Sequence, residues 1–99
     1  AQRTDAPLIV ANVLYDLGTS FMREKSFETA TTYFERVRDD HAGIEDWYTL
    51  SMLSLGECYE ALNRRGDASQ TYQTVLTLRP DDDYGKTAQM RLKRLGGRR

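Results

Sequence analysis

Few side chains in this sequence are of the types that carry out catalysis or bind metals. His41 is the only histidine and Cys58 the only cysteine, which excludes two-histidine metal motifs and an internal disulfide. We expect Cys58 to be a small buried packing residue. The acidic run 81–83 lacks the spacing of a calcium loop, and no glycine-rich phosphate loop is present. We therefore expect no enzyme, no cofactor and no metal.

A more informative pattern occurs twice, 38 residues apart. In each copy a leucine and a glycine are followed by an aromatic residue, an alanine and a second aromatic residue. The first copy is Leu17, Gly18, Phe21, Ala30 and Phe34, and the second is Leu55, Gly56, Tyr59, Ala68 and Tyr72. Glycine inside a helix costs about 1 kcal/mol relative to alanine, and close approach of another helix would compensate. We therefore expect two antiparallel helices per copy. Gly18 should pack against the stripe Ala30, Phe34 and Val37, and Gly56 against the stripe Ala68, Tyr72 and Val75.

This series resembles the signature of the tetratricopeptide repeat. The first copy supplies Leu14, Leu17, Gly18, Phe21, Phe27, Ala30, Phe34 and Val37, and the second supplies Met52, Leu55, Gly56, Tyr59, Ala68, Tyr72, Val75 and Pro80. The second copy departs at Arg65, where the first has Phe27, and the first has Ala42 in place of the final proline. The period is also longer than the usual ~34 residues. It is similar to that of bacterial envelope members, so both the cytoplasm and the cell envelope stay open as compartments.

The resemblance implies an all-α fold, a right-handed superhelical array of antiparallel helix pairs with about five helices. We expect one domain over residues 6–96, with repeats at about 7–42 and 44–80. A fifth helix at about 83–95 is either a cap or a partial third repeat. Residues 1–5 and 97–99 are expected to be flexible ends. No run of 18 apolar residues is present, so no membrane span is expected.

Several side chains are expected to bury or end particular helices. Ser26 is a predicted N-cap, Asn63 a predicted left-handed C-cap, and one of the three aspartates at 81–83 should cap the fifth helix. The predicted buried stripe of the first helix is Val10, Val13, Leu14, Leu17 and Phe21. The predicted buried stripe of the fifth is Ala88, Leu92 and Leu95, with Lys86, Gln89, Arg91, Lys93 and Arg94 on its wet side.

The charge is distributed unevenly along the chain. Residues 84–99 contain six basic and no acidic residues, whereas residues 1–83 contain eight basic and fifteen acidic residues. The basic end could be a solvated helix whose cations suit a helix C-terminus. It could instead bind nucleic acid or an acidic partner, although nucleic acid is the lesser alternative. A third reading is head-to-tail self-association of the acidic body with the basic tail, which leaves the chain a monomer or a weak oligomer.

The resemblance further implies a binding groove, because the first helix of each pair lines the concave face in this family. The candidate groove residues are Asn12, Tyr15, Asp16, Thr19, Met22, Arg23, Leu50, Leu53, Ser54, Glu57, Glu60, Lys93 and Arg94. Some members bind a partner's C-terminal carboxylate through Lys and Asn side chains where this chain has Tyr15, Thr19 and Ser54, so we predict no carboxylate clamp. The expected function is a scaffold that binds a peptide or partner subunit in this groove. Self-association into a larger complex is the alternative.

Overall fold

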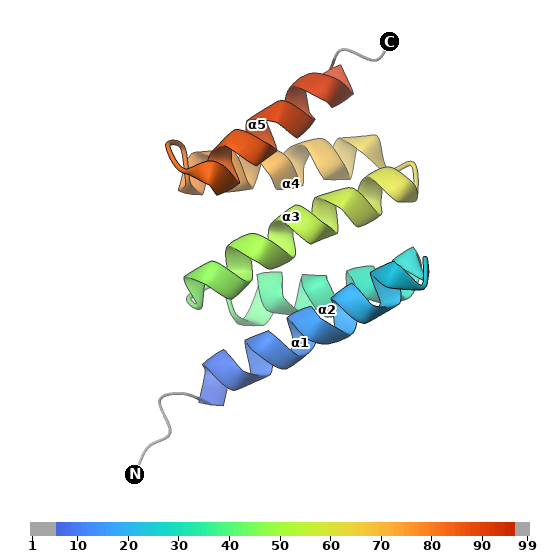
Figure 1. The fold of residues 1–99 in the computed structure, drawn as a ribbon, viewed down its shortest axis with the longest axis vertical. Coiled ribbons are helices and arrows are strands. Elements are labelled where there is room, and N and C mark those ends of the chain that lie inside the picture. Colours follow the sequence, from blue (N-terminus) through green and yellow to red (C-terminus); the bar gives the residue numbers. More distant parts are fainter. Residues whose placement is uncertain (1–5, 97–99) are drawn as a thin grey trace.

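Five helices form nearly all of the part of the chain that the structure, a computed structural model, describes, residues 6–96. They are α1 (Ala6–Arg23), α2 (Phe27–Asp40), α3 (Glu45–Ala61), α4 (Arg65–Leu78) and α5 (Asp83–Gly96) (Figure 1). Within residues 6–96 there is no strand, and the all-α prediction is confirmed. The predicted flexible ends, 1–5 and 97–99, lie outside the described residues.

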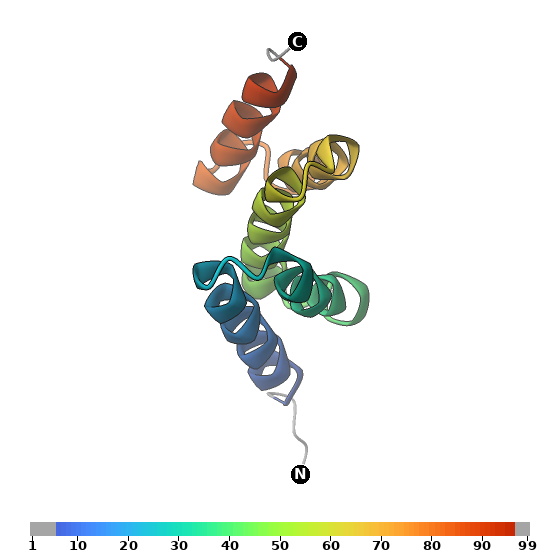
Figure 2. The same ribbon diagram turned by 90° about the vertical axis from the view of Figure 1, so that its right-hand side faces the viewer.

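The helices are arranged in two layers. Each helix packs against the next along the chain, and α3 also contacts both α1 and α5. Figure 2 shows α1, α3 and α5 on one side of the molecule and α2 and α4 on the other. The result is an elongated body of 54 × 31 × 18 Å. This confirms the predicted array of antiparallel helix pairs, since α1–α2 and α3–α4 are successive pairs and α5 lies against the second.

The two repeated glycines admit an aromatic ring from the partner helix. A Cβ atom placed on Gly18 would lie 2.6 Å from the ring of Phe34, and one on Gly56 would overlap the ring of Tyr72. Both rings are fully buried. Both glycines thus meet an aromatic residue of the predicted partner stripe, which confirms the predicted packing of each glycine against that stripe. The aromatic ring four residues beyond Ala30 or Ala68 reaches the glycine, and both alanines are fully buried.

The predicted buried stripe of α1 is largely wrong. Val10, Val13 and Leu17 are 41%, 50% and 39% exposed, whereas Ala11, Leu14 and Gly18 are buried. Helical periodicity groups residues on a face but does not reveal what covers that face. Within the described residues, α1 contacts only α2 and α3, so the apolar side turned away from both meets solvent.

The turns between the helices follow the repeat as well. Asn63 has a φ of 63°, as predicted, and so does Lys25, its equivalent 38 residues earlier. Ser26 holds the N-cap position of α2, but its side chain makes no capping hydrogen bond. At the start of α5, the backbone N–H of Gly85 donates to Asp82 Oδ1 at 3.1 Å, which confirms that one of the three aspartates caps this helix.

Candidate functional site

The predicted groove residues lie on α1, α3 and α5, the helices that share one layer (Figure 2). Asn12 and Asp16 of α1 are the repeat equivalents of Leu50 and Ser54 of α3, so each pair occupies the same helix face. Asn12, Leu50 and Ser54 are partly exposed and Asp16 is exposed, as is Arg23 one helix turn beyond Thr19. We call Asn12, Asp16, Arg23, Leu50 and Ser54 the contact face.

No hydrogen bond of the described residues involves the side chain of Asn12, Asp16 or Ser54. Thr19 differs from these neighbours, because its hydroxyl oxygen is buried without a partner within residues 6–96. The contact face therefore offers an amide, a carboxylate, a hydroxyl and an aliphatic side chain that internal contacts leave available.

Three other predicted groove residues contribute mainly to packing between helices. The ring centroid of Tyr15 lies 5.9 Å from that of Phe34 and 5.4 Å from that of Trp47, which joins α1 to α2 and α3. Leu53 is only 9% exposed and belongs to the core, and Met22 packs against that core. These side chains shape the layer more than they offer surface to a ligand.

The two predicted groove glutamates are held by the basic helix α5. Arg91 Nη1 donates to Glu57 Oε2 at 2.7 Å and Arg94 Nη2 donates to Glu60 at 2.9 Å. The Tyr72 hydroxyl of α4 also donates a hydrogen bond to Glu60 at 2.5 Å. Burial of the phenol is the larger cause, and this hydrogen bond the next, of a raised pKa for Tyr72. Three helices, α3, α4 and α5, therefore meet through this set of charges.

These ion pairs correct the predicted wet side of α5. Arg91 is partly buried, and its Nη1 also lies 3.5 Å from the carbonyl oxygen of Leu53. Lys86 and Lys93 are exposed, as predicted, together with Gln89 and Arg94. Two of the four cations in the described part of α5 are thus paired with acidic side chains of α3, so less positive charge is free there than the sequence suggested.

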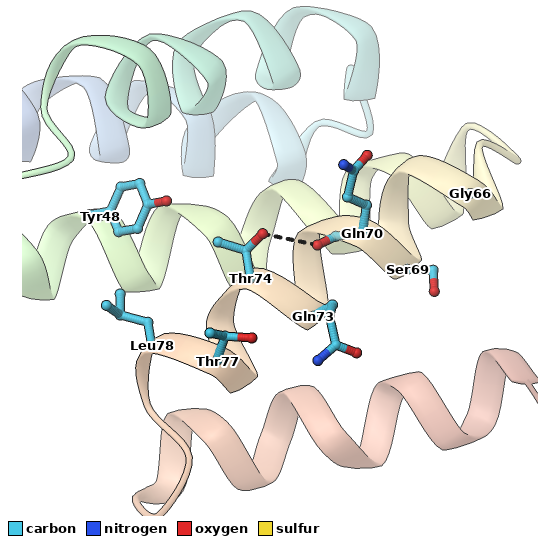
Figure 3. Close-up of a pocket in the computed structure, with 8 residues that line it drawn as sticks. All are labelled: Tyr48, Gly66, Ser69, Gln70, Gln73, Thr74, Thr77 and Leu78. Carbon is cyan, nitrogen blue, oxygen red and sulfur yellow. Dashed lines mark hydrogen bonds between the residues drawn. The ribbon is translucent and has the colours of Figure 1, made fainter.

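A cavity of about 760 Å³ lies on the outer side of α4 (Figure 3). Ser69, Gln73 and Thr77 of α4 line it, and Tyr48 of α3 and Leu78 stand at one end. The Thr74 hydroxyl on the same wall donates to the carbonyl oxygen of Gln70 at 3.1 Å. No charged residue lines this cavity. No sequence motif points to this cavity, because uncharged polar residues on one helix face have no characteristic spacing.

The groups that could have supported chemistry have structural roles or are isolated. Cys58 is fully buried, as predicted, and burial raises the pKa of its thiol to about 12. Because the thiolate is the reactive form, this cysteine is inert near neutral pH. Among residues 6–96, no cluster of three or more histidine, cysteine or carboxylate side chains could hold a metal ion.

The fold is that of a helical-repeat protein, in which successive helix pairs stack side by side. A family model described as the tetratricopeptide repeat matches residues 50–82, which span most of α3, all of α4 and the turn before α5. This match and the repeated spacing in α1–α2 support an assignment to the tetratricopeptide repeat family. No curated protein matches the chain.

Repeat proteins of this class typically present extended surfaces for other proteins, and the family is generally a non-catalytic scaffold. None of the helices in the described part of the chain has both the length and the hydrophobicity that crossing a lipid bilayer requires. The family match suggests a protein-interaction module.

Proposed function

We propose that this chain binds an extended peptide or an amphipathic helix of a partner protein along the contact face. The observation that carries this proposal is the equivalence of Asn12 with Leu50 and of Asp16 with Ser54 on neighbouring helices of one layer. Side chains at equivalent positions of stacked repeats form a row, and a row of accessible groups suits a ligand that runs across the helices.

The chemistry of the row indicates the kind of partner. Leu50 supplies an apolar side chain, Asn12 an amide and Ser54 a hydroxyl, and Asp16 and Arg23 add one charge of each sign. Such a surface favours a ligand with apolar anchors flanked by polar groups, rather than a highly charged one. Nucleic acid fits poorly, because Arg91 and Arg94 are already paired with glutamates.

Site-specific photo-crosslinking tests where the partner binds. A photoreactive side chain placed at Ser54 should capture a protein from an extract of the source cells, whereas the same group at Gln73 on the outer side of α4 should not. Gln73 is a matched control because it is an exposed polar residue on a neighbouring helix and lines the α4 cavity. Equal or stronger capture at Gln73 would move the binding site to the α4 cavity.

A substitution on the contact face provides a second test with the captured protein. Leu50→Glu introduces a charge at a partly exposed position, so it should weaken binding of that protein at least about tenfold without unfolding the chain. Gln73→Glu introduces the same charge on α4 and should leave the affinity unchanged. Binding that is unaffected by Leu50→Glu contradicts the proposal.

A further inference from the structure

One side of α1 is apolar and uncovered. Ile9, Val10, Val13 and Leu17 are 57%, 41%, 50% and 39% exposed, and they lie within one side of the helix by the spacing of about 100° per residue. We call these four residues the open face. The other large apolar side chains that are exposed are Leu8, Leu78 and Met90, so no other helix of the described chain presents a comparable patch.

In the second repeat, the side of α3 that is equivalent to the open face is buried. Val13 and Leu17 are equivalent to Ser51 and Leu55 of α3, and both of those are fully buried. Tyr59 lies on the same side of α3, and its hydroxyl donates to Glu35 of α2 at 2.6 Å. The open face is therefore the counterpart of a helix-to-helix interface already present within the chain.

The composition of the open face indicates which kind of helix can cover it. At α3, the Tyr59 hydroxyl pairs with Glu35 and also accepts a hydrogen bond from Arg38 at 3.4 Å. The equivalent residue of α1 is Phe21, which has no hydroxyl. Glu35 and Arg38 of α2 both pair with the Tyr59 hydroxyl. A covering helix with such charged groups would find no hydroxyl on Phe21, and burying unpaired charges is costly. The covering helix must instead be aliphatic.

Within residues 6–96, α1 itself is the helix with such an aliphatic face. The outer side of α5, at the other end of the stack, is lined by Lys86, Gln89, Met90 and Lys93. Head-to-tail stacking of two copies would place both lysines against the aliphatic side chains of α1, whereas head-to-head stacking brings together two faces of the same kind. In such a pair the same patch is used by both copies.

We infer that two copies of this chain associate through their α1 helices, with Val13 close to the twofold axis. The interface is small, since it consists of one face of one helix from each copy. Its area falls well below the roughly 1,600 Å² of a standard interface, so we expect weak association, with a dissociation constant on the order of 100 µM. Apolar contacts also make it insensitive to salt.

Sedimentation equilibrium of the 99-residue chain, from about 10 to 1,000 µM at low and high salt, tests this inference. Dimer should accumulate with concentration at both salt levels. Val13→Glu should raise the dissociation constant at least about tenfold. Met90→Glu is the matched control, because Met90 is an equally apolar and more exposed residue on α5, and it should leave the constant unchanged.

Disulfide cross-linking tests the geometry independently of any charged substitution. Val13→Cys should form a covalent dimer under mild oxidation much faster than Met90→Cys, because a residue near a twofold axis meets its own copy. The natural Cys58 is buried and does not compete. Three results would each overturn the inference: a monomer at every concentration, association abolished by salt, and cross-linking through Met90→Cys as fast as through Val13→Cys.

Discussion

Gly56 and Tyr72 make the closest contact between the helices of the second repeat. The glycine is required by packing, since the Tyr72 ring occupies the space where a Cβ atom would stand. Gly66, in the first turn of α4, is different: a Cβ there would meet nothing within 4 Å. Space for a Cβ atom is therefore present at Gly66 and absent at Gly56, and this space decides whether alanine is tolerated.

We predict that Gly56→Ala lowers the free energy of unfolding by about 1–3 kcal/mol, because overpacking of the core outweighs the gain in helix propensity. Gly66→Ala should leave stability unchanged or raise it by up to about 1 kcal/mol. Urea denaturation of both variants measures the difference. If Gly56→Ala is as stable as Gly66→Ala, the Tyr72 ring does not fill the space beside this glycine.

Tyr59 and Tyr72 bring hydroxyl groups to positions where the first repeat has Phe21 and Phe34. Tyr59 connects α3 to α2 through Glu35, and the guanidinium of Arg64 lies 4.5 Å from its ring centroid. Glu60, which accepts from Tyr72, stands at the position of Met22 in the first repeat. Two positions with apolar side chains in the first repeat thus carry a hydrogen-bonded pair in the second.

Burial and the Glu35 carboxylate raise the pKa of Tyr59 from 10.0 to about 12. Because the folded state holds this proton more tightly than the unfolded state, the contribution to stability is complete below pH 10 and disappears as the pH rises through about 12. We predict a steeper loss of stability above pH 10 for the wild type than for Tyr59→Phe, measured by urea denaturation at a series of pH values. Equal slopes would show that the phenol is not protected from ionisation.

At the scale of the elements, α5 is held both by apolar contacts and by charges. Ala88 is fully buried and Leu95 nearly so, while Arg91 pairs with Glu57 and Arg94 pairs with Glu60. The turn before the helix is equally constrained, because a Cβ on Gly85 would collide with the carbonyl group of Arg79. Glu57 and Glu60 of α3 thus help to position the basic helix α5.

We predict that Arg91→Ala lowers the free energy of unfolding by about 1 kcal/mol, since it removes a partly buried ion pair and its packing. Lys93→Ala, on the exposed side of the same helix, should change stability by less than about 0.5 kcal/mol. Hydrogen exchange should show faster opening of α5 in Arg91→Ala alone. Equal protection in the two variants would mean that the pair with Glu57 does not hold the helix.

At the scale of the whole molecule, the array exposes three different surfaces. The contact face runs across α1 and α3, the cavity lies on the outer side of α4, and the open face ends the stack at α1. Two of the four cations in the described part of α5 are paired with glutamates of α3. If the proposed function is correct, we expect apolar anchors to contribute more than charge to the recognition of the partner.

We predict that a peptide ending in a free carboxylate binds no more tightly than the same peptide with an amidated end. Tyr15, Thr19 and Ser54 provide no cation, and Tyr15 is in contact with Phe34 and Trp47. Fluorescence polarisation with acidic C-terminal peptides and their amides measures the difference. A preference for the free carboxylate of tenfold or more, lost in high salt, would show that the chain is a carboxylate-binding module after all.

The repeated spacing predicted two pairs of helices and the burial of Phe34 and Tyr72, because residues 38 apart perform the same task in each unit. The fifth helix was predicted separately, from its apolar stripe and the aspartates before it. The absence of a catalytic site, which the composition suggests, stays a prediction. The location of the ligand on Asn12, Asp16, Arg23, Leu50 and Ser54 stays a prediction. Tyr15 and Leu53 have the spacing of groove residues, yet both pack between helices. Spacing alone therefore selects more groove residues than the surface presents.

The sequence by itself determined which residues share a helix face, because an α-helix has a constant period. Only the tertiary structure decided what lies opposite each face: an aromatic ring at Gly18 and Gly56, Glu57 at Arg91, and solvent at Val13. The physical reason is that covering a face depends on a neighbouring helix far away in the sequence. An identical stripe of apolar residues is core where such a neighbour is present and surface where it is not.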